Sequence, residues 1–566
     1  MNQGSYIISR LFYLIIFLAA SMELLSAPPP VPSAGIIERE LEREYEGKPL
    51  EPDKEVPDIQ IDIPKEKLEI PDGRKVYISR IKIKGNESIS TKEILCWFKN
   101  YLNRELSLKD VYEICNIIDQ NYAKKGYFLA RSYPPPQTIK NNVLIIEVIE
   151  GKLGNVRVIG NKCYCESFIK SYFCSLQGKP LRYDKFMRAL MLLNDNSDLV
   201  AGAIFEKGKE FGCADVIVRV SDSRPDHLYL NGNNYGKNLT TNVRVGGRVD
   251  WGNLITQGDK LSVAEVVGFP FNALYFTNAN YFVPLNRKGT SLELSYLFSK
   301  FKIEELTNLN LKGRSNIATL KVNQALVRRR SLSVDFFSYF DYKQIQNFVL
   351  DQRTSYDKLR VLTVGSLLDH FTKSQGRDYL VLRFGLGIPD FLGGLKAVDS
   401  ESSRVGGGGR FYVFNMEYDR IQHLPRDCFF YFHGSGQLSP SKLTLPEQFY
   451  IGGVDTVRGF PLAVGLGDSG YCFNFEVRIP PLFLANKKIF RLKKRLKEVV
   501  QLDFFLDHGG AFLQSEGNTF LWGSGLGAKV KGPYNLVLSV DVGFPLNHRD
   551  ENRGVFTYIK VTGQPF

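Results

Sequence analysis

Long apolar runs are missing from almost all of this 566-residue sequence. The exception is "LFYLIIFLAA", from Leu11 to Ala20, and no other stretch approaches the roughly 18 uninterrupted apolar residues typical of a transmembrane helix. If the remaining chain lies in a membrane, we expect a closed barrel. A barrel is the only other structure that satisfies its own backbone hydrogen bonds in lipid.

Histidine is also scarce, and the residues that usually accompany catalysis are not grouped. The chain has six histidines, and "LDHGG" places His508 beside Asp507 without a Ser or Cys nucleophile motif. The stretches "GSGLGAK" (Gly523–Lys529) and "VGGGGR" (Val405–Arg410) resemble phosphate-binding loops, but neither lies between a predicted strand and a predicted helix. We therefore predict no enzyme activity, no nucleotide site and no cofactor.

Cysteine is limited to eight residues, and their spacing does not predict a metal site. Cys163 and Cys165 are too close for a zinc knuckle, and no histidine lies near them in the sequence. Six of the eight cysteines precede residue 220. In an exported chain they could form disulfides, and in a folded interior they could remain free thiols. The sequence leaves both alternatives open.

Aromatic residues and glycine are abundant, and this composition favours β structure. The chain contains 40 Phe, 28 Tyr and 50 Gly, and 43% of its residues are hydrophobic. Its formal net charge is +13 and its pI is about 9.1. A basic chain suits nucleic acid, anionic lipid or an acidic partner, and the charge alone selects none of them.

The N-terminus is typical of an exported protein. Arg10 precedes the apolar run, and small residues follow it up to Ser21. This layout predicts a secretory signal peptide over residues 1–27, although a membrane anchor is the alternative. Residues 28–72 are rich in proline and charge and read as a linker, which begins with a short charged helix, "AGIIERELEREYEG" (Ala34–Gly47).

Two copies of a small α/β unit follow the linker. Residues 73–151 predict the order strand, helix, helix, strand, strand, and residues 152–222 repeat that order at a period of about 75 residues. The first unit opens with "KVYISRIKIKG" and the second with "GNVRVIGN", each read as one strand. An internal repeat of this kind indicates two domains of the same fold.

From residue 223 to 566 apolar and polar residues alternate. In "SLELSYLFS", the residues Leu292, Leu294, Tyr296 and Phe298 alternate with serine and glutamate. A period of two means one apolar and one polar face. In a soluble sandwich the polar face meets water, whereas in an outer-membrane barrel the apolar face meets lipid and the polar face lines the lumen. Export and the loss of helical spacing favour the membrane barrel.

The alternating region contains sixteen segments, an even number as in single-chain bacterial barrels. Their predicted first residues are Leu228, Asn242, Asp259, Asn272, Gly289, Asn316, Arg330, Asp357, Arg377, Gly409, Cys428, Gly470, Val499, Thr519, Tyr534 and Gly554. The chain ends in Phe566, and a terminal aromatic residue is common in such barrels. We therefore predict a membrane all-β barrel of 16 antiparallel strands, preceded by two small α/β domains and an N-terminal helix.

With these parts in place, the chain resembles the outer-membrane transporters of two-partner secretion, the TpsB or haemolysin activator family, over nearly all of its mature length. "GYFLARSYPPPQTIKNNVLIIEVIEGKLGNVRVIGN" (Gly126–Asn161) is similar to the junction between that family's two periplasmic POTRA domains. "NYGKNLTTNVRVGGRVDWGNLITQGDKLSV" (Asn234–Val263) is similar to its first barrel hairpin. "EQFYIGGVDTVRGFP" (Glu447–Pro461) resembles its long sixth surface loop, and "DFFLDHGGAF" (Asp503–Phe512) resembles a strand motif with Asp before Gly.

The resemblance implies that the sixth loop folds back into the barrel, where Arg458 would lie against the wall and pair with Asp507. Such an arginine is costly alone and acceptable when it forms a fork with a carboxylate. The alternative is an exposed arginine in a flexible loop. The loop residues implied to shape this contact are Val457, Arg458, Gly459, Phe460, Gly452 and Gly453.

The resemblance also implies a function. The chain would lie in the outer membrane of a Gram-negative cell with its α/β domains in the periplasm. These domains would capture an unfolded TpsA-like client on their sheet edges, and the barrel would secrete it. The N-terminal helix would plug the lumen through Ile36, Ile37 and Leu41, or else be a solvated helix in a linker. We expect contacts with outer-membrane lipid, no nucleic acid, no metal, and a monomer.

Two other functions remain possible for a chain with these parts: an assembly factor and a porin. An assembly factor that inserts other barrels would share the Arg458 loop, but such insertases commonly carry more POTRA domains than two. A porin for small solutes would need no POTRA domain.

A basic segment departs from the family pattern. "ANKKIFRLKKRLKEVV" (Ala485–Val500) holds seven Lys or Arg where a short turn is expected. It could be a solvated turn, or it could contact an acidic client or anionic headgroups.

Overall fold

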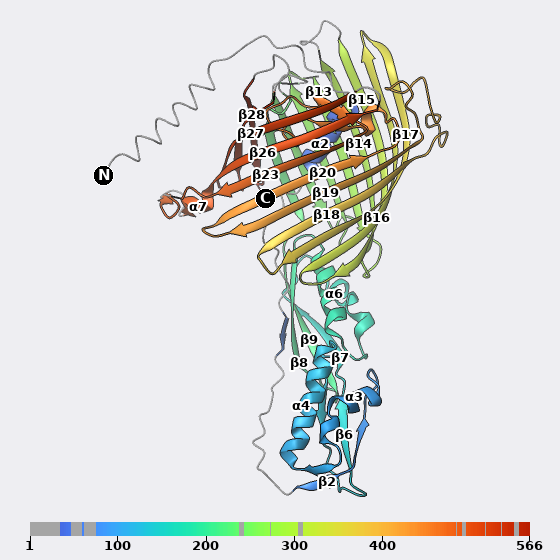
Figure 1. Cartoon of the computed structure of the whole chain (residues 1–566), viewed down its shortest axis with the longest axis vertical. Helices are drawn as coiled ribbons and strands as arrows, with labels where there is room; N and C mark the ends of the chain where they lie inside the picture. The colour runs from blue at the N-terminus through green and yellow to red at the C-terminus, as the bar shows by residue number, and fades with distance from the viewer. Residues whose placement is uncertain are drawn as a thin grey trace, which may run out of the picture.

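The structure is a computed structural model of the chain. It describes residues 34–46, 59–61, 75–236, 241, 243–271, 273–303, 310–482, 484–489, 494–514, 517–533, 535–547 and 554–565. The predicted signal peptide (1–27) and the terminal Phe566 lie outside the described residues. Figure 1 shows a large barrel at one end of the molecule and two small α/β units in line beneath it. No helix in the described ranges is long and apolar enough to cross a membrane.

Sixteen antiparallel strands close into one barrel. They are β10 (Asp226–Asn233), β11 (Val243–Gly252), β12 (Lys260–Phe269), β13 (Leu274–Pro284), β14 (Thr290–Ile303), β15 (Leu311–Arg328), β16 (Leu332–Val349), β17 (Gln352–Thr372), β18 (Gly376–Gly387), β19 (Phe411–Leu424), β20 (Cys428–Leu438), β23 (Ser469–Ile479), β26 (Val500–Leu513), β27 (Gly517–Lys531), β28 (Val537–Pro545) and β29 (Phe556–Gly563). Each pairs with the next barrel strand, and β29 pairs with β10. The predicted sixteen-stranded barrel is confirmed, and each predicted first residue lies within five positions of the observed one.

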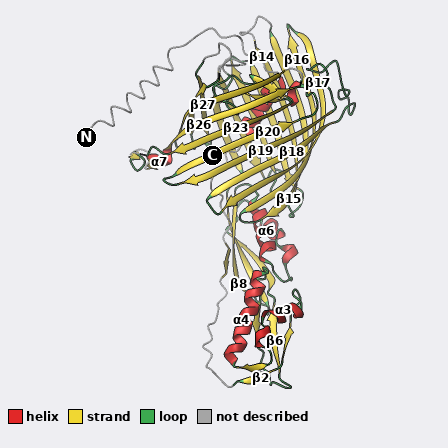
Figure 2. Cartoon of the chain, viewed as in Figure 1, coloured by secondary structure: helices red, strands yellow, loops and turns green. Residues whose placement is uncertain are grey.

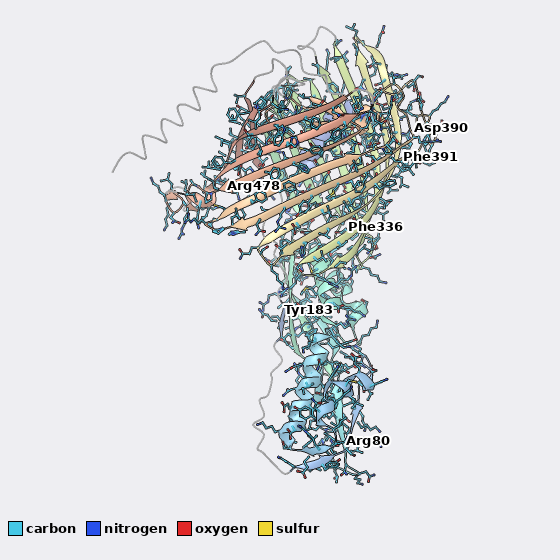
Figure 3. The ribbon with its side chains drawn as sticks, viewed as in Figure 1. Arg80, Tyr183, Phe336, Asp390, Phe391 and Arg478 are labelled. Carbon is cyan, nitrogen blue, oxygen red and sulfur yellow. The ribbon has the colours of Figure 1, made fainter. Side chains whose placement is uncertain are left out.

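The alternation along the strands sorts side chains between the two faces of the wall. On β14, Leu294 and Tyr296 are exposed on the outer face, while Ser291 and Ser299 are buried on the inner face. Phe336 on β16 is likewise exposed, and Figure 3 places it on the barrel. The outer face is therefore the apolar one, as a lipid-facing surface requires.

The first α/β unit contains one more strand pair than the sequence predicted. Its elements are β2 (Val76–Ile78), β3 (Arg80–Lys84), α3 (Thr91–Trp97), η1 (Lys99–Tyr101), β4 (Arg104–Leu106), α4 (Leu108–Lys124), β5 (Arg131–Tyr133) and β6 (Val143–Ile149). The single strand predicted in "KVYISRIKIKG" is wrong, because the chain breaks at Ser79. The backbone N–H groups of Ser79 and Arg80 both donate to the carbonyl of Asn142, and the two halves then pair with β4 and β6 respectively.

The second α/β unit has the element order that the sequence predicted. It consists of β7 (Lys152–Ile159), α5 (Glu166–Ser171), η2 (Cys174–Leu176), α6 (Tyr183–Asn194), β8 (Leu199–Lys207) and β9 (Cys213–Asp222). It is held against the barrel rim: Arg328 forms ion pairs with Asp195 at 2.8 Å and Asp335 at 2.7 Å, and Arg287 lies over the ring of Phe168 at 4.1 Å. These contacts come from the end of β15 and from the turn between β13 and β14, so this end of the barrel faces the two units.

Two short elements precede the units along the chain. Helix α2 (Ala34–Glu46) lies inside the barrel, where Figure 2 shows it in red among the yellow strands. Strand β1 (Ile59–Ile61) falls in the predicted linker, yet it adds to the sheet of the second unit in parallel with β8. The sequence did not predict this strand.

All eight cysteines lie in the described residues, and all eight are free thiols, so the structure favours the second of the two alternatives for them. Cys115 is buried in the first unit, and burial raises the pKa of its thiol to about 12. Cys165 is exposed, and a hydrogen bond from the Ser167 hydroxyl lowers the pKa of its thiol. The cores of both units are therefore held by apolar packing.

Candidate functional site

A long loop between β20 and β23, residues 439–468, turns back into the barrel. It contains η3 (Leu445–Glu447) and a small hairpin of β21 (Phe449–Ile451) and β22 (Gly465–Gly467). Gly452 and Gly453 end the first hairpin strand with φ of 100° and 104°, values that favour glycine because it has no Cβ. These two glycines turn the chain, and residues 454–464, which connect β21 to β22, form the tip of the loop.

Arg458 at the loop tip forms a fork with Asp507 on β26. Its Nε lies 2.7 Å from Asp507 Oδ2 and its Nη2 lies 2.8 Å from Asp507 Oδ1, while its backbone N–H donates to the same carboxylate at 3.0 Å. The Arg458 side chain is 7% exposed and that of Asp507 is fully buried. Three hydrogen bonds to one carboxylate fix both the side chain and the backbone of the tip.

A second carboxylate and an aromatic ring complete the environment of Arg458. Glu476 on β23 accepts a hydrogen bond from Arg458 Nη1 at 2.8 Å, and it also pairs with Arg478 at 2.8 Å. The guanidinium lies over the ring of Phe505 with its Cζ 3.6 Å from the ring centre. One buried cation is thus held between two carboxylates and a ring, all from the wall strands β23 and β26.

Glycines on the wall make room for the loop tip. A Cβ at Gly523 of β27 would lie 2.0 Å from the carbonyl oxygen of Arg458, and a Cβ at Gly543 of β28 would lie 2.6 Å from the backbone nitrogen of Gly459. Gly459 itself has a φ of 94°, and its N–H donates to the hydroxyl of Tyr558 on β29 at 3.3 Å. The loop backbone therefore lies flat on the wall, where any larger residue would displace it.

We expect Gly523→Ala to push the loop tip off the wall, because the added methyl group meets a backbone oxygen that cannot swing away. Secretion of a partner protein should fall at least fivefold. Limited trypsin digestion of outer-membrane preparations should cleave after Arg458, since a displaced tip exposes that bond. The matched control is Gly436→Ala on β20, where the nearest atom to the new Cβ lies 3.7 Å away. Equal resistance to trypsin in the two variants would contradict this account.

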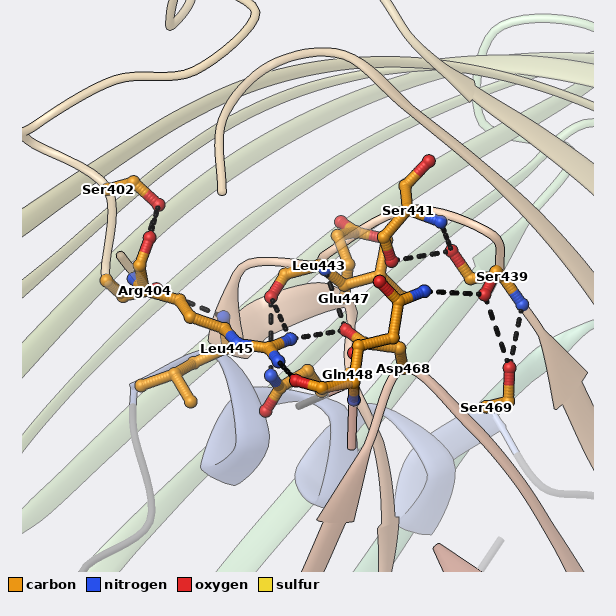
Figure 4. A network of polar contacts seen from close by, with 12 residues as sticks. Ser402, Arg404, Ser439, Ser441, Leu443, Leu445, Glu447, Gln448, Asp468 and Ser469 are labelled. Atoms are coloured by element: carbon orange, nitrogen blue, oxygen red, sulfur yellow. Dashed lines mark hydrogen bonds and ion pairs between the residues drawn. The ribbon is translucent and has the colours of Figure 1, made fainter. Parts of the chain in front are cut away.

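The two ends of the loop are fastened by a separate polar network, shown in Figure 4. Asp468 accepts a hydrogen bond from the backbone of Leu443 at 2.8 Å and forms a buried ion pair with Arg404 at 2.5 Å. Arg404 comes from the loop between β18 and β19, and the neighbouring Ser403 accepts a hydrogen bond from Leu445 at 3.0 Å. The loop is therefore clamped at its base as well as at its tip.

Helix α2 contacts an apolar patch on the inner wall, which we did not expect of a polar lumen. The sequence predicted that the polar faces of the strands line the lumen, and this part of the inner wall is apolar instead. Ala34, Ile37 and Leu41 are buried in a common cluster with inner-wall residues. These wall residues are Val266, Leu274, Phe276, Leu297, Phe301, Ile303, Ile317 and Ile345. Apolar packing against strands β12 to β16 thus holds this face of the helix.

The other face of α2 makes polar contacts with the wall and the loop. Glu40 forms a bidentate pair with Arg244 on β11, at 3.1 and 3.2 Å, and both side chains are almost fully buried. Arg39 donates to the carbonyl of Gln448 at 2.5 Å and lies over the ring of Tyr450. The helix therefore contacts both the barrel wall and the first part of the loop.

Ile36 is buried with the loop residues Tyr450, Leu462 and Ala463. Gly35 lies so close to the loop that a Cβ there would be 2.6 Å from Pro446. Of the three residues predicted to plug the lumen, Ile37 and Leu41 face the wall and Ile36 faces the loop. The two elements consequently form one assembly inside the barrel.

The structure places the predicted loop residues together and adds others that the sequence did not indicate. Val457 and Phe460 are buried in one cluster with wall residues, and Arg458 reaches Asp507. Glu476 and Phe505 were missed, because nothing in their alternating strands distinguishes them from other residues of the wall. Gly523 was noticed only within "GSGLGAK", a stretch that resembled a phosphate-binding loop and forms part of β27.

The adjacent pair Asp507 and His508 is divided by the barrel wall. Asp507 is fully buried in the lumen, whereas His508 stacks on Trp522 with ring centres 3.8 Å apart and bonds the hydroxyl of Tyr471. Trp522 is exposed on the outer face. Neighbouring residues of a strand point to opposite faces, so these two side chains cannot act together in catalysis.

The basic segment 485–500 forms a projecting hairpin between β23 and β26, at the barrel end that faces the α/β units. It contains β24 (Lys488–Ile489), β25 (Lys494–Arg495) and α7 (Leu496–Val499), and residues 490–493 lie outside the described residues. Lys497 pairs with Asp427 of a neighbouring turn at 2.7 Å. Figure 1 shows α7 standing out from the side of the barrel. The expectation of a short turn is therefore wrong.

Comparison with known families gives two matches. Residues 212–530 match the model of the haemolysin secretion/activation proteins ShlB, FhaC and HecB. Residues 76–151 match the model of the ShlB-type POTRA domain. The first match spans more than half of the chain and includes the loop with Arg458 and the strand with Asp507.

Individual relatives are distant in sequence and similar in length. The heme/hemopexin transporter protein HuxB of Haemophilus influenzae is 22% identical over 541 residues, with 92% of each chain covered. The outer membrane transporter CdiB of Escherichia coli is 21% identical over 408 residues, covering 69% of this chain and 67% of that protein. The solved structure of CdiB from Escherichia coli superposes with a TM-score of 0.72 at 18% identity, covering 96% of this chain and all of the other. This structural likeness supports the barrel fold.

Proposed function

Because the chain belongs to the ShlB/FhaC/HecB family of haemolysin secretion/activation proteins, outer-membrane transporters with periplasmic POTRA domains, we propose that it secretes one large exported partner through its barrel. The partner would be a TpsA-like protein that crosses the periplasm unfolded. The observation that carries this proposal is the loop inside the lumen, whose buried Arg458 is held by Asp507 and Glu476. A family match over the loop and the strands that hold it points to the same role.

In the state described here, α2 and the loop both lie inside the lumen, where they would obstruct an extended polypeptide. We propose that α2 is the element that leaves. It is joined to the second unit by residues 47–58 and β1, whereas the loop is continuous with two wall strands. The loop would remain on the wall and guide the passing chain. Folding of the partner outside the cell would give the transport its direction, since no nucleotide site was predicted.

The outer surface and the closed sheet support two further proposals. Exposed apolar side chains on the outer face, such as Leu294, Tyr296 and Phe475, would contact outer-membrane lipid. The barrel closes on itself and leaves no unpaired strand in its sheet. We propose a monomer on this ground, and crosslinking in native membranes should give no dimer.

Depletion of the protein tests the proposed function. A large exported protein encoded beside this chain would be the candidate partner. The candidate should then disappear from the culture medium, while the other outer-membrane barrels remain assembled. Restoring the chain from a plasmid should restore secretion. A general loss of outer-membrane proteins would instead support the assembly factor that shares the loop, and would overturn a dedicated transporter.

A further inference from the structure

The outer face of β14 turns basic near one end of the barrel. Arg287, in the turn before β14, contacts the second unit, so Ile303 at the end of β14 lies at the opposite end of the barrel. That end is the extracellular one, because POTRA domains lie in the periplasm. Phe301 and Ile303 face the lumen, where they pack beneath α2. Side chains alternate along a strand, so Lys300 and Lys302 point outward.

The same face of β15 is also basic, and its charges stand directly opposite those of β14. Lys300 is paired with Arg314, and Lys302 is paired with Lys312, in the ladder between the two strands. Directly opposed side chains of an antiparallel pair have Cβ atoms about 5 Å apart, and like charges at this spacing are destabilising. Two successive pairs of cations would therefore be stabilised by an anion bound between them.

Carboxylates of the chain neutralise only part of this basic face. Lys312 forms an ion pair with Asp351, in the turn between β16 and β17. Neither Lys300 nor Arg314 takes part in an ion pair within the described part of the chain. Residues 304–309, which connect the two strands, lie outside the described residues. Two opposed charges are thus left uncompensated among the residues that the structure describes.

Aromatic rings place the pair of Lys300 and Arg314 at the edge of the lipid-facing band. The guanidinium of Arg314 lies over the ring of Phe298, with its Cζ 5.4 Å from the ring centre. Tyr275 on β13 stands opposite Lys300. The next outward residue of β14 after Phe298, toward the periplasm, is Tyr296, which is 50% exposed. Membrane barrels carry aromatic girdles at both interfaces, so the two charges lie where the headgroups of the outer leaflet begin.

The basic strip has a boundary on each side. On one side Gln346 of β16 stands opposite Arg314 and offers a neutral amide. On the other side the hydroxyl of Tyr275 donates to Glu265 of β12 at 3.4 Å, which places a carboxylate beyond the ring. The cations therefore form a strip one ladder wide, between β14 and β15.

We propose that the outward pair of Lys300 and Arg314 binds a phosphate group of a glycolipid headgroup in the outer leaflet. Arginine can form two parallel hydrogen bonds with a phosphate, and lysine adds a point charge. The acyl chains of the same lipid would lie along the apolar band beside Tyr296 and Phe298, from which a free anion would gain nothing. This site adds a defined headgroup contact to the apolar contact with lipid, and it does not depend on the proposed secretion function.

Lipid binding to the full mature protein in nonionic detergent tests the site. The probe is lipid A with two phosphates, presented in the micelles, and bound lipid is counted by native mass spectrometry. Lys300→Glu gives Arg314 an opposite charge within the ladder and should weaken binding of the probe at least tenfold. Lys488→Glu makes the same change opposite Arg495 on the projecting hairpin, at the other end of the barrel, and should bind as wild type.

A matched probe is the same lipid with both phosphates removed. It should bind the wild-type protein at least tenfold more weakly than intact lipid A does, and it should bind Lys300→Glu and wild type equally. Equal affinity of the two probes for the wild-type protein would overturn recognition of phosphate. Displacement of lipid A by an equimolar amount of inorganic phosphate would show a free-anion site and overturn the assignment to a lipid.

Two further outcomes decide whether this pair is the site. Equal loss of binding in Lys300→Glu and Lys488→Glu would overturn it, because any exposed pair of cations would then serve. Unchanged binding in Lys300→Glu would overturn it as well, and an accompanying fall in secretion would point instead to an acidic protein segment.

The unfolding temperature separates loss of the site from damage to the barrel. It is read from the difference in gel migration between folded and unfolded protein. Without lipid, Lys300→Glu should unfold at the same temperature as wild type or higher, because opposite charges replace a like-charge pair. Lipid A should raise the unfolding temperature of the wild type and leave that of Lys300→Glu unchanged. A lower temperature for the variant without lipid would overturn the direct opposition of charges on which the site depends.

Discussion

Replacing Arg458 with alanine should leave a folded barrel in the outer membrane and reduce the partner in the culture medium at least tenfold. The substitution removes two side-chain hydrogen bonds to Asp507 and one to Glu476, and it leaves two buried carboxylates without their shared cation. The backbone N–H bond can persist, but the side-chain bonds cannot. Removing one partner of a buried ion pair costs about 3–5 kcal/mol, enough to detach the loop tip from the wall.

The barrel itself should tolerate this change, because its strands are held by sixteen ladders to which Arg458 does not belong. A difference in migration between the unheated and the heated protein in a denaturing gel would show the intact barrel. Arg458→Lys keeps the charge but cannot form the fork, so we expect intermediate secretion. Arg383→Ala, which removes a half-exposed pair with Glu417 within the wall, is the matched control and should secrete normally. Normal secretion by Arg458→Ala would contradict the role given to the loop.

Replacing Arg244 with alanine should open the barrel at rest. Glu40 on α2 would then be buried without its bidentate partner, and a loss of about 3–5 kcal/mol would shift the equilibrium of the helix toward the released state by about two to nearly four orders of magnitude. Planar bilayers should show large, long-lived ion conductances with the variant and brief ones with the wild-type protein.

Two further variants separate loss of the ion pair from general damage to the barrel. Arg377→Ala removes a pair with Asp369 between two wall strands and does not touch α2, so its conductance should match the wild type. In Glu40→Met combined with Arg244→Met, neither charge is left buried alone, and replacing both members of a buried pair by apolar residues is often neutral. This double variant should be closed again. An open double variant would show that Arg244 acts on the wall and not through the helix.

The barrel could be predicted from the sequence because its signal is repeated sixteen times. A single alternating strand is ambiguous, but the sum of many, together with the predicted signal peptide, selects one architecture. The pairing of Arg458 with Asp507 was accessible through resemblance to a family. Glu476 was not, since inward carboxylates are frequent in a polar lumen and only the fold places this one within 2.8 Å of Arg458.

The apolar patch beneath α2 has a signal in the sequence. On β14 the outward residues change from Leu294 and Tyr296 to Lys300, while the inward ones change from Ser295 to Phe301. The period of two is kept, but the apolar residues now point inward and the polar ones outward. This is the pattern expected where the apolar face of a helix covers the inner wall. Strand β1 offers no such signal, because three residues in a proline-rich linker carry too little pattern to be recognised.

The ladder that joins β29 to β10 has four paired positions, from Leu230 opposite Gly563 to Asn233 opposite Lys560, whereas β16 and β17 share eighteen. The loop tip is bound to this last strand, since Tyr558 accepts from Gly459 and donates to the carbonyl of Phe460 at 3.2 Å. The last barrel strand therefore supplies part of the seat of the loop tip, which is complete only in a closed barrel. We expect a chain truncated before β29 to have neither a sealed barrel nor a fully seated loop.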